Sequence, residues 1–349
     1  MSPRLGFAML SAGMLAVLVI AGCSKTTTPP VPTPTPTSSA TVAPDTLYVQ
    51  DATSRTVRAY KGASGINGGA LASNVYPTAD IANPDIIYGI AADVLWYPDQ
   101  TNNRISVWTT ALTKTNVNPD FTVPLTNQEG AATFDVTHNL LIVAQNTSNT
   151  VQIYASASTL GQGGNTTPAG TATLTMTDGC VSGAPRPQEM YYDPVHDRLF
   201  VSDNGCVIGV FDAFGAGANA AAIAHTNYAA TANRQITGLF SPDGLAYNPT
   251  TDVLWVAERS HLQVDVLMTA STLNGSASHA QTITNFAGPL GLAYDAVRDL
   301  LFVYDAQAVD VLPNATTASG AFNAIPNRRV IFDAQVSLSG FGLFLDTTH

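Results

Sequence analysis

The sequence predicts an all-β protein, a six-bladed β-propeller whose ring is closed by pairing of its C-terminal strand with its N-terminal strands. Three observations lead to this prediction. A short apolar motif recurs six times, turn residues separate each copy from alternating segments, and the two ends of the repeat region each lack the part that the other supplies. The composition agrees, because only 11% of the residues are charged and Lys and Glu, the usual residues of helix surfaces, are scarce.

Residues 1–22 are predicted to be a bacterial lipoprotein signal peptide. A single Arg4 precedes an unbroken apolar run that is too short, and too close to the terminus, for a membrane span. The run ends in "IAG" before Cys23, which resembles the lipobox, where the cysteine thiol receives a diacylglycerol. A coincidental cysteine in an ordinary signal sequence is the alternative. Ser24 follows the cysteine, which favours the outer membrane if the cell is Gram-negative.

Residues 23–44 are predicted to be a tether that begins at the lipidated Cys23. After Lys25 the segment has almost no charge and no large apolar side chain, and its threonines and prolines favour an extended polyproline conformation. At roughly 3 Å per residue, it would hold the next domain some tens of ångströms from the bilayer. The protein is therefore predicted to be exported and lipid-anchored to the cell envelope without spanning the membrane.

Residues 45–349 are predicted to form one repeat domain. An apolar triplet that closes on a polar residue occurs six times, and the first residues of successive copies are 48, 46, 58, 55 and 47 positions apart. These spacings suit a four-stranded propeller blade. The copies are Leu47–Asp51, Leu95–Asp99, Leu141–Gln145, Leu199–Asp203, Leu254–Glu258 and Leu301–Asp305.

Further strands are predicted on both sides of each copy. A strand and a turn come before it, as in "EMYYDPVHD" (189–197), and an alternating strand comes after it, as in "RTVRAY" (55–60). A fourth, weaker strand is indicated by segments such as "NRQITG" (233–238). Each blade is therefore expected to have four strands.

The two ends of the domain are predicted to complete one blade together. The domain begins at Asp45 with a second strand, and it finishes with "LSGFGLFLDTTH", a first strand with nothing after it. Pairing of Phe341–Leu345 beside Leu47–Val49 would close the ring and leave no open sheet edge between the first and last blades.

These segments resemble the blades of NHL-repeat and related six-bladed propellers. Blades of that kind read Pro-x-Gly-Ile/Leu-Ala, then an aliphatic and aromatic strand ending in Asp, then Asn-Asn-Arg-Ile; the best matches here are "PDGLAYN" with "DVLWVAE", and "YPDQTNNRISVW". The resemblance covers residues 45–349. It implies the architecture but little about function, since such propellers include enzymes, sensors and scaffolds.

The gluconolactonase-like members of this group imply a metal site near the channel axis. Their ligands include a Glu at the start of one first strand and an Asn in another. Glu129 and Glu189 fall near such starts, but the position of the Asn is occupied by Asp243 in this chain, which puts lactonase activity in doubt. An acidic mouth built from Asp85, Glu129, Glu189 and Asp243 would still attract Ca²⁺, and the sequence indicates no other cofactor.

An acidic residue ends five of the six second strands. A ring of carboxylates around a divalent cation is one interpretation, and a hydrogen bond from each carboxylate to its own hairpin turn is the other. Recurrence in nearly every blade favours the structural role, since a site usually uses residues of two or three blades. The residues are Asp51, Asp99, Asp203, Glu258 and Asp305, with Gln145 in the third copy.

Cys180 and Cys206 are predicted to form a disulfide, because a pair of cysteines in an exported domain tends to oxidise. They occupy the loop that enters the fourth blade and the turn between its second and third strands, which lie at the same face of a propeller. Two free thiols are the alternative. A stapled loop would be a rigid platform, so Arg186 and Gln188 in the same segment are predicted to contact a ligand.

Charge and motifs narrow the function. A net charge of −11 with 14 Lys and Arg residues argues against nucleic acid as a partner. No Gly-x-Ser-x-Gly, His-Glu-x-x-His, P-loop or dinucleotide motif occurs, which favours a non-catalytic role. We therefore predict a surface or periplasmic module that binds a ligand, an envelope protein or carbohydrate. The alternatives are a metal-dependent hydrolase of the lactonase kind and a scaffold subunit of an envelope complex.

Overall fold

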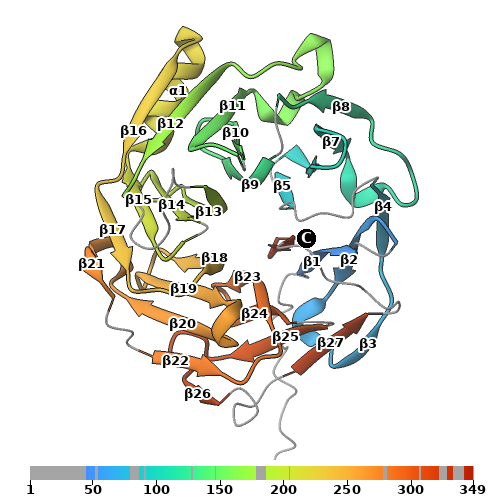
Figure 1. Ribbon diagram of the computed structural model, residues 1–349. Coiled ribbons are helices and arrows are strands. Elements are labelled where there is room, and N and C mark those ends of the chain that lie inside the picture. The colour runs from blue at the N-terminus through green and yellow to red at the C-terminus, as the bar shows by residue number, and fades with distance from the viewer. Residues whose placement is uncertain are drawn as a thin grey trace, which may run out of the picture. The chain divides into compact units, whose positions relative to one another are not determined.

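The computed structural model describes residues 45–51, 54–78, 86–89, 92–126, 129–145, 147–177, 186–203, 205–277, 281–305, 308–321, 328–332 and 342–348. These residues form six sheets, which Figure 1 shows arranged around one centre. The predicted six-bladed propeller is confirmed. The predicted signal peptide and tether lie outside the described residues. Among the residues that are described, no helix is long and apolar enough to cross a bilayer.

Blades 1 and 2 are the four-stranded sheets. Blade 1 consists, from the channel outwards, of β28 (Leu343–Asp346), β1 (Thr46–Asp51), β2 (Thr56–Lys61) and β4 (Asn74–Pro77). Blade 2 consists of β5 (Ile87–Gly89), β6 (Val94–Asp99), β7 (Arg104–Thr109) and β8 (Phe121–Pro124).

Blades 3 and 4 follow the same order from channel to rim. Blade 3 contains β9 (Glu129–Asp135), β10 (Leu140–Gln145), β11 (Thr150–Ala155) and β12 (Gly170–Thr175). Blade 4 contains β13 (Pro187–Asp193), β14 (Arg198–Asp203), β15 (Ile208–Asp212) and β17 (Arg234–Thr237).

Blades 5 and 6 repeat this order of strands from channel to rim. Blade 5 contains β18 (Pro242–Asn248), β19 (Val253–Glu258), β20 (Gln263–Met268) and β22 (Gln281–Thr284). Blade 6 contains β23 (Pro289–Asp295), β24 (Leu300–Asp305), β25 (Ala308–Pro313) and β27 (Arg328–Phe332).

The ring closes in blade 1 as predicted. β28, from the end of the chain, pairs antiparallel with β1, so that Thr46 lies opposite Asp346 and Val49 opposite Leu343. Within this pairing the rings of Tyr48 and Phe344 lie 6.4 Å apart. The inner strand of blade 1 thus comes from the C-terminal end of the domain, whereas its other three strands come from the N-terminal end.

Four blades have a fifth strand that the four-strand prediction lacks. The connection between the third and fourth strands of the next blade adds a short parallel strand to the outer edge of the sheet. The pairs are β16 (Asn227–Thr231) with β12, β21 (Gly275–Ser276) with β17, β26 (Gly320–Ala321) with β22, and β3 (Gly68–Ala70) with β27. Each of these pairs joins neighbouring blades at the rim through backbone hydrogen bonds.

The longest of these connections carries α1 (Phe214–Ala224), at the rim in Figure 1. Its buried face consists of Phe214 and small residues such as Ala218 and Ala222, which pack with side chains of blades 3 and 4. A Cβ atom at Gly215 would lie 2.3 Å from the hydroxyl of Tyr192, so glycine is required where the helix begins. The helix therefore fills space between two blades.

The buried side chains form six clusters, one at each contact between neighbouring blades. One cluster, for example, joins Tyr48 and Tyr76 of blade 1 to Trp108 of blade 2, with the last two rings 5.7 Å apart. The second strands are apolar along almost their whole length, since both of their faces pack against other sheets. Each blade therefore depends on both of its neighbours for its stability.

Six equivalent residues, the turn anchors, hold the turn after each third strand. Each lies just before a second strand, and its side-chain oxygen accepts a hydrogen bond from a backbone N–H after the third strand, at 2.5–3.1 Å. Five of them have φ between 49° and 56°, a region that Asp and Asn tolerate better than most residues. The turn anchors are Asp45, Asp93, Asn139, Asp197, Asp252 and Asp299.

The ring has two faces, which we name by their loops. Each first strand runs from a segment that enters the blade to a turn that leads into the second strand. The turn face carries these first-to-second-strand turns, which include residues 136–139, 194–197, 249–252 and 296–299. The entry face, at the other end of the same strands, carries the entry segments and the turns between second and third strands.

Candidate functional site

The acidic residues that end the second strands are bound to the backbone. All five are at most 3% exposed. In blades 1, 2 and 4 the donors lie in the same hairpin, as predicted: Ser54 to Asp51, Asn102 to Asp99, and Gly205 and Val207 to Asp203. In blades 5 and 6 the donors lie in the entry segment instead: Phe240 to Glu258, and Ala287 and Gly288 to Asp305. Their positions fit a structural role.

Two of the four predicted metal ligands have described side chains. Glu189 lies in β13 and Asp243 in β18, the first strands of adjacent blades. Ser202 lies opposite Glu189 in the sheet, and its hydroxyl donates to the backbone oxygen of Asp243 at 3.5 Å. Asp85 and the side chain of Glu129 lie outside the described residues, so the four-carboxylate site stays a prediction. Over the part of the chain that is described, no group of three or more His, Cys, Asp and Glu residues is arranged to hold a metal ion.

The other predicted site residues lie at the entry face. Arg186 is exposed just before β13, and Gln188 is half-buried within this strand. Cys206 is buried between β14 and β15, whereas Cys180 lies outside the described residues. The disulfide and the two ligand contacts therefore stay predictions.

Burial of Asp243 makes stability depend on pH. Its side chain is 9% exposed, and this burial raises its pKa from 3.8 to about 6, against the opposing effects of the Arg259 side chain and backbone. The folded chain thus binds a proton more tightly than the unfolded chain between these two pH values. The contribution of Asp243 is therefore most favourable below pH ~4 and is lost as the pH rises through about 6.

We expect Asp243→Asn to stabilise the protein at neutral pH, because the variant buries no charge. The gain over wild type should be about 3 kcal/mol above pH ~6 and should disappear below pH ~4. Guanidinium unfolding at both pH values measures it. An advantage that is equal at both values would contradict the assignment. Stabilisation of the wild type, but not the variant, by added Ca²⁺ would instead support the predicted metal site.

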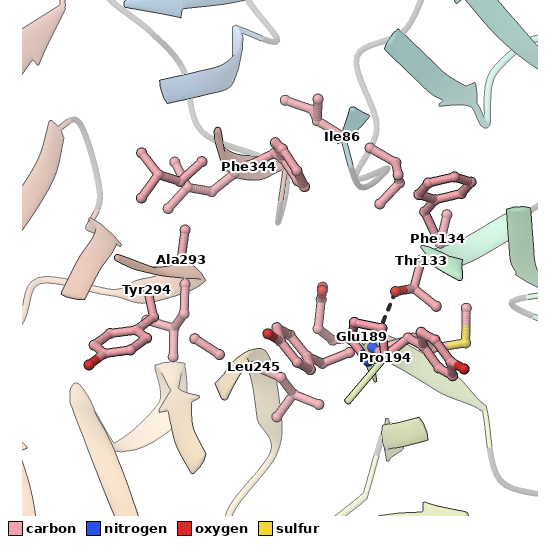
Figure 2. A pocket seen from close by; sticks show the side chains of 18 of the residues that line it. Ile86, Thr133, Phe134, Glu189, Pro194, Leu245, Ala293, Tyr294 and Phe344 are labelled. Carbon is pink, nitrogen blue, oxygen red and sulfur yellow. Dashed lines mark hydrogen bonds between the residues drawn. The ribbon is translucent and has the colours of Figure 1, made fainter. Parts of the chain in front are cut away.

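The first strands enclose a cavity of about 350 Å³ in the channel. Its wall consists mainly of apolar side chains from all six blades, such as Ile86, Phe134, Leu245, Ala293 and Phe344, which Figure 2 shows around the opening. Both the volume and the apolar lining are typical of binding sites for small molecules.

Few polar groups face this cavity. The tyrosines in its wall direct their hydroxyls into the protein: Tyr191 donates to the oxygen of Tyr247 at 3.1 Å, and Tyr294 to Asp299 at 3.0 Å. Thr133 Oγ1 accepts a hydrogen bond from the backbone of the next blade, drawn dashed in Figure 2. The carboxylate in the described wall belongs to Glu189. Within the lining that is described, the cavity is therefore apolar with one acidic side chain, Glu189.

The mouth of the cavity is at the turn face. Two of its lining residues, Val136 and Pro194, are exposed, and both lie in first-to-second-strand turns. Glu189 and Ile86 lie nearer the entry-face ends of their blades, so the acidic group lies at the end of the cavity away from this mouth. The cavity thus opens on the turn face. Arg186, which was predicted to contact a ligand, lies on the opposite, entry face.

Comparisons with known proteins give the fold. One similar solved structure is a chain in the crystal structure of a nidogen/laminin complex, with a TM-score of 0.58 and 13% sequence identity over 88% of this chain and 99% of that chain. No protein-family model and no curated protein matches the chain. At this identity the likeness shows the six-bladed propeller and nothing finer.

Sequence reasoning missed the cavity because its lining has no motif. The residues that form it are ordinary apolar residues of first strands, and they meet only when the ring closes. One signal was present, since the first strands carry apolar residues at positions facing both the channel and the neighbouring blades. This signal does not distinguish an open channel from a filled one.

Proposed function

We propose that the protein is an exported, lipid-anchored propeller that acts as a binding module, with the channel cavity as its ligand site. The observation that carries the proposal is the apolar cavity of about 350 Å³ with Glu189 at the end away from its mouth. A pocket of this kind binds through apolar contact and is oriented by a few polar groups.

The lining defines the class of ligand. Aliphatic and aromatic walls favour a small, mostly apolar molecule, because burial of apolar surface drives its binding. The carboxylate of Glu189 favours one donor group on this molecule, such as an amine, since a hydrogen bond to a charged acceptor is stronger than a neutral one. We infer an apolar amine as the best fit.

The sequence supports the envelope location. A lipobox-like segment at Cys23 and a tether rich in threonine and proline would hold the propeller near a membrane. The NHL-like resemblance and the similar chain from a nidogen/laminin complex are both compatible with a binding role, although many functions occur on this fold. A lactonase-like hydrolase has less support, because the channel wall is mainly apolar.

Binding of N-phenyl-1-naphthylamine, an apolar amine whose emission rises in apolar surroundings, tests the proposal. The Cys23→Ser full chain, purified without detergent, should bind this probe. Ala293→Phe, which fills the cavity, should weaken binding at least ~10-fold, equivalent to about 1.4 kcal/mol. Glu189→Gln should weaken it roughly 5-fold through loss of the charged acceptor.

The control is Leu262→Ala at the entry face, which should bind as the Cys23→Ser chain does. Circular dichroism and melting of each variant establish that the ring remains folded. Should Ala293→Phe bind the probe unchanged, the channel cavity is not the site.

A further inference from the structure

The chain enters the propeller at the turn face. β1 begins at Thr46, which lies opposite Asp346 at the end of β28. In blades 3 to 6 a turn connects the corresponding first and second strands, whereas in blade 1 the chain enters at this place. The predicted tether, residues 23–44, is therefore attached to the propeller on the turn face.

Three valines on this face are exposed at similar positions in their turns. Val136, Val195 and Val297 have exposed fractions of 51%, 69% and 74%, and each follows the end of a first strand by one or two residues. A single exposed apolar side chain is ordinary, but its repetition in three blades makes a patterned surface. On the entry face, Phe240 and Leu262 of blade 5 are exposed, and Ile331 of blade 6 is exposed opposite Ala308, where β25 begins.

Each of these turns follows a buried aspartate that is bound by a side chain of the turn itself. The aspartate that ends each of the three first strands is fully buried, and the third residue after it is a basic side chain bound to its carboxylate. The pairs are His138 with Asp135 at 2.6 Å, His196 with Asp193 at 2.7 Å, and Arg298 with Asp295 at 2.5 Å. The carboxylates of these three aspartates are therefore buried beneath the turns and do not lie at the exposed surface beside the valines.

We propose that the turn face is the membrane-facing side of the propeller, and that Val136, Val195 and Val297 contact the lipid surface. The proposal rests on the lipid anchor of the proposed function. The tether from Cys23 can extend for tens of ångströms, but when it is not extended it lets this face approach the bilayer. It also keeps the effective concentration of the face at the bilayer high, so weak contacts from three side chains are sufficient for docking.

The docked orientation has two consequences for function. The mouth of the channel cavity, next to Val136 and Pro194, faces the lipid, so its ligand reaches it from the membrane surface. The entry face, with Arg186, Phe240 and Leu262, is turned away from the membrane and is displayed to other molecules of the envelope.

Tryptophan reporters in the full, lipidated chain test the orientation. The native residues Trp96, Trp108 and Trp255 are fully buried and provide the same background in every variant. Val195→Trp and Leu262→Trp place one exposed indole on the turn face and one on the entry face. Each variant is reconstituted into vesicles of phosphatidylethanolamine and phosphatidylglycerol, with and without brominated phosphatidylcholine.

We expect bromine to quench roughly half of the reporter emission of Val195→Trp, since docked apolar side chains lie roughly 5–10 Å into the boundary between headgroups and acyl chains. Leu262→Trp should be quenched no more than the wild-type background. Val297→Glu, added to Val195→Trp, should reduce the quenching several-fold while the chain stays in the vesicles.

Equal quenching of the two reporters, or no quenching of either, would overturn the proposal. So would an emission shift of Val195→Trp that depends on protein concentration without vesicles, because it would indicate a second copy as the occupant.

Membrane fractionation of the Cys23→Ser chain separates this inference from the anchor on which it rests. Release of the variant from the membrane fraction, together with a lipid on wild-type Cys23, establishes the anchor. If wild type carries no lipid, the anchor fails and the orientation fails with it. If wild type is lipidated but its reporters are quenched equally, only the orientation is wrong.

Discussion

Deletion of Ser339–His349 should abolish folding of the propeller or reduce its stability by more than about 5 kcal/mol, most of the stability of an ordinary domain. The deletion removes β28, the inner strand of blade 1, and leaves β1 as an open edge beside blade 6. It also exposes buried residues such as Tyr48 and removes Leu343 from the cluster between blades 6 and 1. Aggregation and rapid proteolysis are the expected readouts, since an unpaired edge recruits other chains.

A shorter deletion provides the control. Removal of Thr347–His349 leaves β28 intact and, among the hydrogen bonds of the described residues, takes away those of Thr348 to Asp346. This variant should remain soluble and should melt close to the wild type. A chain without Ser339–His349 that stays monomeric with unchanged melting would show that β28 is not needed for closure.

The blades could be predicted from the sequence because the signals that specify them are local. An apolar run such as Leu254–Glu258 and an alternating strand after it are readable within one repeat. Closure followed from the complementary halves at the two ends. The parallel fifth strands could not be predicted, because β16 and β21 pair with the preceding blade and their short sequences, "NYAAT" and "GS", lack the alternation of a strand.

The candidate site was less predictable, because the residues that line it come from six separate repeats. Attention to charged and sulfur-containing residues led to the entry face, where Arg186 and Cys206 lie. The cavity depends instead on how six first strands approach one another. A Cβ atom at Gly244 would lie 1.9 Å from the backbone oxygen of Leu290, so the "PDGL" motif of blade 5 serves the packing of inner strands. Glu189 is the residue on which both approaches agree, although they give it different roles.

The turn anchors illustrate a signal that was present but overlooked. An Asp or Asn precedes the leucine of each motif copy by two positions in all six repeats. Spacing alone does not reveal that its side chain binds a turn about 19 residues later along the chain, because the partner lies beyond two further strands. The acid at the end of the motif is almost as regular, since five of the six copies have it. Comparison of the repeats therefore does not show which of the two positions contributes more to stability.

Asp252→Ala should therefore destabilise the protein by about 3 kcal/mol, even though Asp252 does not line the cavity and is not one of the three valines proposed to contact lipid. Asp252 accepts hydrogen bonds from the backbone of Ser271 at 2.8 Å, from the Ser271 hydroxyl at 2.7 Å and from the buried Tyr247 hydroxyl at 2.8 Å. Alanine provides none of these acceptors, and its Cβ atom is strained at the φ of 55° that this position adopts. Guanidinium unfolding, monitored by tryptophan emission, measures the loss.

Asp252→Asn is the matched control, because blade 3 uses Asn139 at the equivalent position. There the amide oxygen accepts a hydrogen bond from the backbone of Ser158 at 3.0 Å, and the amide nitrogen donates to the Ser158 hydroxyl at 2.9 Å. Asparagine also tolerates positive φ, so we expect a loss of at most ~1 kcal/mol. Equal losses for the alanine and asparagine variants would mean that the charge of Asp252, and not its hydrogen bonds and backbone conformation, stabilises the blade.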